Sequence, residues 1–154
     1  MRISIAAVGR LARSPEADLV KLYAERASAA GRALGLGPVE VLEVEARKPG
    51  KAAEAAALRP HLQGSHVIAC DERGKPRPSA AFAAEIAGLR DQGVRRLTFV
   101  IGGADGLDPA LVAEAQATLA FGPQTWPHAL ARAMLAEQVW RAVSILAGSP
   151  YHRV

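Results

Sequence analysis

The chain has 154 residues, of which half are hydrophobic and 22% are charged, so a disordered protein is excluded and one domain with a buried core is expected. A net charge of +4 favours a polyanionic partner over an acidic one, although a merely soluble basic protein fits the charge equally well. A single cysteine, Cys70, excludes an internal disulfide and a two-cysteine metal site, and points to an intracellular, reducing compartment.

The first half of the chain alternates between strand and helix signals. The apolar run at 3–8 is too short for a signal peptide or a membrane span and predicts a buried strand. Ser14 and Pro15 predict the start of a helix that Gly35 and Gly37 stop. Further elements are predicted as a strand at 39–44, a short helix at 52–62 around Pro60, and a buried strand at 66–70.

The second half continues the same alternation. A loop at 72–78 precedes a helix at 79–92, and the strand at 97–101 is the most hydrophobic in the chain. A short helix from Pro109, a short strand near 119–121 and a long helix at 128–146 complete the prediction. This order indicates an α/β fold in which helices cover both faces of a mostly parallel sheet, built as one domain over 1–154.

Three loops are the candidate binding segments, because ligands of parallel sheets bind where strands end: 70–78, 102–108 and 122–127. Gly102 and Gly103 follow a buried strand and would let the backbone approach a ligand closely. Their spacing is not that of a dinucleotide or phosphate loop, and an ordinary tight turn is an equal alternative. The Gly- and Pro-rich segment 121–128 exposes backbone groups that suit an adenine edge, although in isolation a plain connection is the commoner reading.

The last helix and the tail carry the remaining candidates. A core stripe is predicted from Ala131, Leu135, Val139, Ala142 and Leu146. Arg132 lies off that stripe, as do Glu137 and Arg141, whose spacing predicts a solvated ion pair. The tail residues Tyr151, His152 and Arg153 combine a stacking ring, an imidazole and a guanidinium that suit an RNA base and its backbone. A frayed terminus is the common alternative.

Taken together, three segments give the chain a resemblance to a known family. The segments 101–107 (IGGADGL), 127–132 (PHALAR) and 150–153 (PYHR) resemble the ribosomal RNA large subunit methyltransferase H family, in the right order and over nearly the whole chain. The resemblance implies a SPOUT-type fold with a C-terminal trefoil knot, a homodimer with active sites near the subunit interface, and a cytoplasmic enzyme. The implied reaction is methylation at N3 of a pseudouridine in 23S rRNA of the assembled ribosome, with S-adenosyl-L-methionine as donor and with no metal and no membrane.

The resemblance also assigns residues. The cofactor-binding positions are Cys70 as an apolar contact, Gly102 with Gly103, and the stretch Phe121, Gly122, Pro123, Gln124, Thr125 and Trp126. His128 and Arg132 would line the site, and Tyr151, His152 and Arg153 would bind substrate. The chain departs from relatives at Asp105, Trp140 and Val154, which bears on fine substrate contacts rather than on the reaction class.

A mechanism follows from the chemistry. The donor is already activated, so alignment with the acceptor nitrogen is the main task, while the imide proton must leave. We expect His152 or His128 to assist proton removal, and Arg153 and Arg132 to hold phosphate or the developing anion. The alternatives are a non-catalytic ribosome- or RNA-binding protein of the same fold, and a flavodoxin-like or nucleotide-binding domain, which the missing phosphate-loop patterns disfavour.

Overall fold

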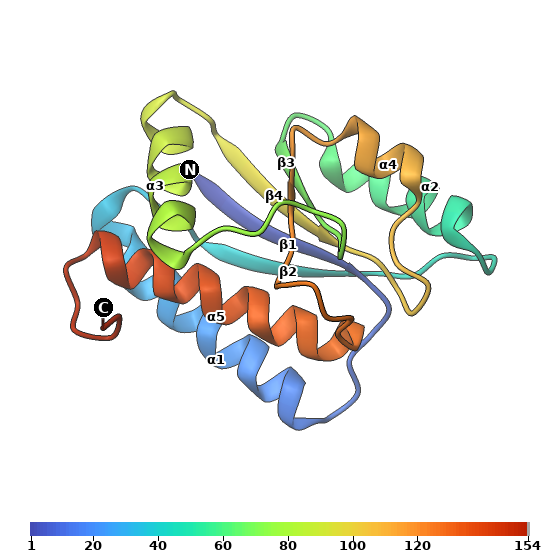
Figure 1. The fold of residues 1–154 in the computed structure, drawn as a ribbon, viewed down its shortest axis with the longest axis horizontal. Helices are drawn as coiled ribbons and strands as arrows, with labels where there is room; N and C mark the ends of the chain where they lie inside the picture. Colours follow the sequence, from blue (N-terminus) through green and yellow to red (C-terminus); the bar gives the residue numbers. More distant parts are fainter. Residues whose placement is uncertain (154) are drawn as a thin grey trace.

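The structure is a computed structural model that describes residues 1–153, so Val154 and its departure from relatives lie outside the described residues. Strands and helices alternate as the sequence predicts (Figure 1). The strands are β1 (Arg2–Val8), β2 (Val39–Val44), β3 (His66–Cys70), β4 (Arg96–Ile101) and β5 (Ala117–Leu119). The helices are α1 (Pro15–Gly31), the 3-10 turn η1 (Arg32–Leu34), α2 (Lys51–Leu62), α3 (Ser79–Asp91), α4 (Pro109–Glu114) and α5 (His128–Leu146).

The five strands form one parallel sheet in the order β2-β1-β4-β3-β5. The predicted parallel sheet is therefore confirmed. Parallel pairing places all carboxyl ends at one edge, where the loops after β3, β4 and β5 become neighbours. The candidate site lies at this edge because these three strands are adjacent in the sheet.

Helices cover both faces of the sheet, as predicted. One core joins the strands to α1, α3 and α5 through side chains such as Ala27, Phe82 and Leu135. The other core joins them to α2 and α4 through Leu58 and Leu111. Figure 1 shows α1 and α5 lying side by side across one face, with α2 and α4 on the other side of the sheet. Among residues 1–153, no helix is long and apolar enough to cross a bilayer.

The α-helical part of the first helix ends at Gly31, but the chain continues through the 3-10 turn η1, and Gly35, at a φ of 68°, stops it as predicted. Two local predictions need correction. The last strand ends at Leu119, two residues early, because Ala120 bridges to Pro76 instead of continuing along β3. Arg132 does not lie off the buried stripe of α5, since it is only 1% exposed. The predicted trefoil knot stays a prediction.

Candidate functional site

The loop after β3 is fastened to β5 and to the segment that follows it. The backbone amide of Asp71 donates to the carbonyl of Leu119 at 3.0 Å, and that of Lys75 donates to Oγ1 of Thr118 at 3.2 Å. Arg77 donates to the carbonyl of Thr118 at 2.6 Å. A Cβ on Gly74 would lie 2.8 Å from the carbonyl carbon of Leu119, so only glycine lets the two segments touch. The loops 71–78 and 120–127 therefore form one fixed unit.

The glycines after β4 make a tight turn. A Cβ on Gly102 would lie 2.5 Å from the carbonyl carbon of Gly106, and the amide of Gly106 donates to the carbonyl of Gly103 at 3.0 Å. Asp108 then caps α4 by accepting from the amide of Ala110 at 2.8 Å. The turn itself thus requires glycine at position 102, which agrees with the alternative of an ordinary tight turn. A ligand contact at Gly102 or Gly103 stays a prediction.

The segment after β5 is a bent loop with an exposed backbone. Residues 123–127 are exposed, and Gly122 has a φ of 99°, which favours glycine. The indole of Trp126 donates to the carbonyl of Phe121 at 3.2 Å, and the hydroxyl of Thr125 donates to Glu72 at 2.9 Å. These contacts close the loop on itself and on the 71–78 loop. Irregular, accessible backbone of this kind fits recognition of a nucleoside such as the adenosine of the donor.

Cys70 ends β3 beside this loop. Burial raises the pKa of its thiol to about 12, so the sulfur stays neutral at physiological pH. This chemistry fits the predicted apolar contact and excludes a thiolate nucleophile at neutral pH. The described residues 1–153 contain no group of three or more His, Cys, Asp or Glu placed to hold a metal.

Arg132 has partners within the protein. Its guanidinium donates to Glu43 at 3.0 Å and to the carbonyls of Val8 and Gly9 at 3.1 Å each. These groups lie at the carboxyl ends of β1 and β2, so Arg132 ties the start of α5 to the sheet. The structure therefore gives Arg132 different partners from the phosphate that the sequence suggested. Burial lowers the pKa of Arg132, and the negative charge of Glu43 offsets part of that decrease.

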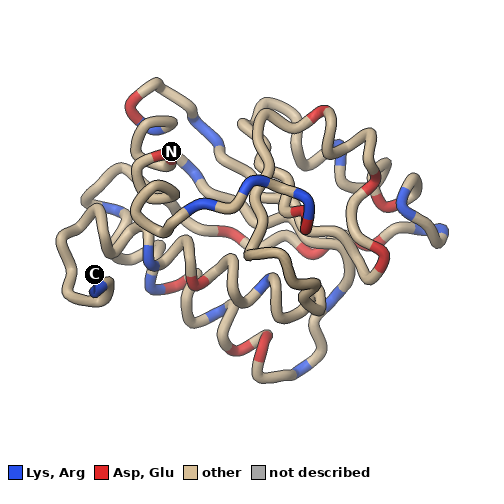
Figure 2. The backbone as a smooth tube through the Cα atoms, viewed as in Figure 1, with Lys and Arg blue, Asp and Glu red and all other residues tan. Residues whose placement is uncertain are grey.

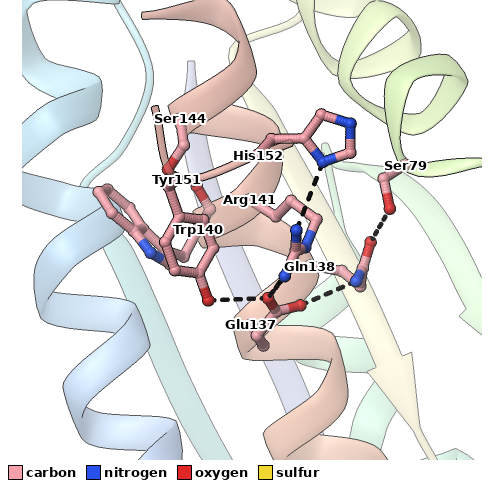
Figure 3. A network of polar contacts seen from close by, with 8 residues as sticks. All are labelled: Ser79, Glu137, Gln138, Trp140, Arg141, Ser144, Tyr151 and His152. Carbon is pink, nitrogen blue, oxygen red and sulfur yellow. Dashed lines mark hydrogen bonds and ion pairs between the residues drawn. The ribbon is translucent and has the colours of Figure 1, made fainter. Parts of the chain in front are cut away.

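The C-terminal tail is anchored to the middle of α5 rather than frayed (Figure 3). The hydroxyl of Tyr151 donates to Glu137 at 2.9 Å, and its ring contacts Trp140 and the guanidinium of Arg141. Arg141 binds Glu137 through Nε at 2.9 Å and also reaches His152. Burial and the bond to Glu137 raise the pKa of Tyr151 to about 12, so the phenol keeps its proton.

Two consequences follow for the predicted tail site. Glu137 and Arg141 are not the solvated helix pair that their spacing predicts, because they are partly buried beneath the tail. The ring of Tyr151 is already engaged by protein groups, so it anchors the tail, while His152 is partly exposed and Arg153 is exposed. The sequence does not show that Glu137 and Arg141 anchor the tail, because their partners lie far along the chain in the tail itself.

The two candidate histidines are separated within one chain. His128 is the first residue of α5, whereas His152 contacts Arg141 in the same helix. At 1.5 Å per residue, these points lie about 20 Å apart along the helix axis. A cavity of about 360 Å³ lies between them, lined by Phe121 and Gly122 of the loop and by Glu137 and Gln138 of α5. The chain brings the loop and the tail anchor to one cavity, but it does not bring the histidines together.

Comparisons with known proteins agree with this architecture. The family model described as "Predicted SPOUT methyltransferase" matches residues 1–152. The chain is 82% identical over 153 residues to the ribosomal RNA large subunit methyltransferase H of Phenylobacterium zucineum, and 67% identical over 153 residues to that of Caulobacter vibrioides. Both alignments cover 99% of this chain and 99% of the relative.

A solved structure shares the fold at low sequence identity. A probable methyltransferase from Bordetella pertussis Tohama I superimposes with a TM-score of 0.56 at 18% identity, covering 92% of this chain and 96% of that one. This likeness concerns the fold alone. The full-length identities and the matching family model are decisive, and the chain belongs to the SPOUT methyltransferases, within the ribosomal RNA large subunit methyltransferase H family.

Proposed function

We propose that this protein transfers a methyl group from S-adenosyl-L-methionine to N3 of a pseudouridine in 23S rRNA of the assembled ribosome. The observation that carries the proposal is the fixed unit of the loops 71–78 and 120–127 after β3 and β5, whose exposed backbone lies at the same sheet edge as the glycine turn after the neighbouring strand β4. Cys70, Gly102, Gly103 and residues 121–126 would hold the donor, which supplies the methyl group when bound.

The charge near these loops supports an RNA substrate. Arg73 and Lys75 are exposed on the 71–78 loop, where Figure 2 shows basic residues close to the candidate site. Arg153 adds an exposed guanidinium on the tail. Such groups bind phosphate, and they would orient the rRNA while the tail meets the base. Action on ribosomes places the protein in the cytoplasm.

The residues of the chain would act mainly by positioning. The loop unit fixes the donor, the tail fixes the acceptor base, and closure between them excludes water. Arg153 and His152 stabilise the acceptor as its imide proton leaves and N3 attacks the methyl carbon. His128 remains a candidate for accepting that proton.

A homodimer would bring a loop unit and a tail from different protomers close together. Within one chain, about 20 Å of α5 separates His128 from the point where His152 is held. Leu19 and Leu22 of α1 are 38% and 39% exposed, and α1 lies along α5, so this face is suited to burial against a second copy. Light scattering should show a dimer for the native protein and a monomer for Leu22→Glu. The control Lys48→Glu, in an exposed turn, should remain dimeric.

Methylation of ribosomes tests the proposed function directly. Ribosomes from a strain that lacks this protein are incubated with it and labelled donor, and RNA fragments are mapped by mass spectrometry. We expect one methyl group on a pseudouridine of 23S rRNA. Label on another nucleotide or on protein would contradict the proposal. Absence of donor uptake in calorimetry would favour the alternative of a non-catalytic RNA-binding protein.

A further inference from the structure

The ring of His152 is held in a defined hydrogen-bonding state. Nη1 of Arg141 lies 3.3 Å from Nδ1 of His152. A guanidinium has donors only, so Nδ1 must accept. A neutral imidazole has one protonated and one unprotonated nitrogen, and its proton therefore lies on Nε2.

Arg141 is itself fixed in place. One oxygen of Glu137 accepts from Nε of Arg141 at 2.9 Å and also from its Nη2, so two donors of the guanidinium converge on that oxygen and fix its orientation. Gln138 donates to the second oxygen of Glu137 at 2.8 Å, and the hydroxyl of Ser79 donates to Gln138 at 2.8 Å. Figure 3 shows Arg141, Gln138 and the tail residue Tyr151 reaching Glu137, while Ser79 of α3 joins the network through Gln138. The hydrogen bond to Glu137 raises the pKa of Arg141, so the cation facing His152 is permanent.

We propose that His152 acts on the substrate as a hydrogen-bond donor through Nε2–H, and that Arg141 and Glu137 are positioning residues that fix this tautomer. The inference rests on the proposed function and deepens it. The N3 imide of pseudouridine lies between two carbonyl groups, whose oxygens take up the negative charge as the N3 proton leaves. An Nε2–H donor stabilises that charge, as an oxyanion hole does. The proton leaves to another base, for which His128 is the candidate, and His152 keeps its own.

This role differs from the expectation that His152 removes the proton. To act as a base through Nε2, the ring would need its proton on Nδ1, pointing at a guanidinium that has nothing to accept it. To act through Nδ1, it would first have to break its contact with Arg141. Both routes oppose the arrangement of the tail, whereas donation through Nε2 uses it as it stands.

Two isosteric substitutions separate the roles. The amide nitrogen of Gln occupies the place of Nε2, and the amide nitrogen of Asn occupies the place of Nδ1. If His152 is a donor through Nε2, His152→Gln should keep kcat on ribosomes within roughly 10-fold of the native value, while His152→Asn should lose roughly 100-fold or more. Equal losses of about 100-fold or more in both variants would indicate a base and overturn the proposal. Near-native rates in both would overturn it too.

The positioning role has its own test, with a matched control on the far side of the sheet. Arg141→Lys keeps the charge but cannot place two donors on Glu137 and still reach His152 with a third, so kcat should fall roughly 10-fold to 100-fold with KM for the donor unchanged. Arg59 also binds a carboxylate through Nε and Nη2, which lie 3.2 and 3.0 Å from the two oxygens of Glu114 between α2 and α4. Arg59→Lys should therefore leave kcat unchanged. An equal effect of the two variants, or none from Arg141→Lys, would remove Arg141 from the role.

A measurement that does not need activity completes the test. Nitrogen-15 NMR of the full-length protein with labelled histidine at about pH 8, where an unperturbed imidazole is neutral, distinguishes protonated from unprotonated ring nitrogens. The signals of His152 are identified by their absence in His152→Gln. A proton on Nε2 and none on Nδ1 supports the proposal, and a proton on Nδ1 refutes it. If the native protein proves inactive on rRNA, the proposed function fails, but this spectrum still decides the tautomer.

Discussion

Replacement of Arg132 by methionine separates a structural role from a substrate-binding one. The side chain is 1% exposed and holds Glu43 and two strand-end carbonyls, so Arg132→Met leaves three acceptors without their donor. Breaking a buried ion pair costs about 3–5 kcal/mol. Because Glu43 is 37% exposed and water can replace part of its contact, we expect the lower end, about 3 kcal/mol.

Urea unfolding and thermal unfolding, each followed by circular dichroism, measure this loss. For a chain of this size, 1 kcal/mol shifts Tm by about 2–4 °C, so Arg132→Met should lower Tm by roughly 6–12 °C. Glu43→Gln is the matched control, because its amide oxygen still accepts from Arg132 and from the amide of Leu11, which lies 2.6 Å from the carboxylate. We expect Glu43→Gln to lose only about 1 kcal/mol.

The outcome that would refute this reasoning is specific. If Arg132→Met unfolds at the same urea concentration as the native protein but methylates ribosomes more than about 100-fold more slowly, then Arg132 contacts the substrate. Its contacts with Val8, Gly9 and Glu43 would then be secondary. A proportionate loss of stability with near-native turnover below the unfolding transition would confirm the structural role.

Three further outcomes are expected. Gly102→Ala should weaken donor binding in calorimetry and destabilise the fold by about 1–3 kcal/mol, because its Cβ would overlap Gly106. The control Gly88→Ala lies in α3 with open space around its Cβ. It should stabilise the fold by about 0.5–1 kcal/mol in urea unfolding. Native Cys70 should react with iodoacetamide far more slowly than unfolded Cys70 at pH 9, because the folded thiol has a pKa of about 12 against 9.0 for the free group. For the same reason the contribution of Cys70 to the free energy of unfolding is full below pH 9 and falls as the pH rises toward 12. Trp126→Phe should abolish any change in tryptophan fluorescence on donor binding, while Trp140→Phe should retain it.

The order of elements is predictable because each buried strand is a short apolar run bounded by glycine, proline or charge. The strands β1, β3 and β4 lie inside the sheet with helices on both faces, and burial of both faces favours a largely apolar sequence. The strand β5 has only three residues, and its register depends on pairing with Ile68 to Cys70. No local pattern encodes that register, which explains the shift of two residues in the predicted strand.

The site was predictable as a set of loops but not as a set of side-chain roles. Glycines and prolines mark the bends at 102–108 and 121–127 in the sequence itself. Arg132, in contrast, binds Glu43, which lies 89 positions away, and an arginine on a helix is read by default as solvated. Likewise the spacing of Glu137 and Arg141 predicts an exposed pair, because nothing nearby in the sequence shows that the tail returns to cover them.

Helix α5 sets the distance between the loop unit and the tail within one chain, and a buried arginine and a partly buried arginine fix its two parts. Arg132 fixes the start of the helix to the ends of β1 and β2, next to the loop that ends at Pro127. Arg141 fixes the tail further along. At 100° per residue the two arginines point about 180° apart, so one faces the sheet while the other faces away from it. A single rigid helix thus holds the loop unit and the tail of one chain about 20 Å apart, each beside its own arginine, and in the proposed homodimer the loop unit of one protomer would meet the tail of the other.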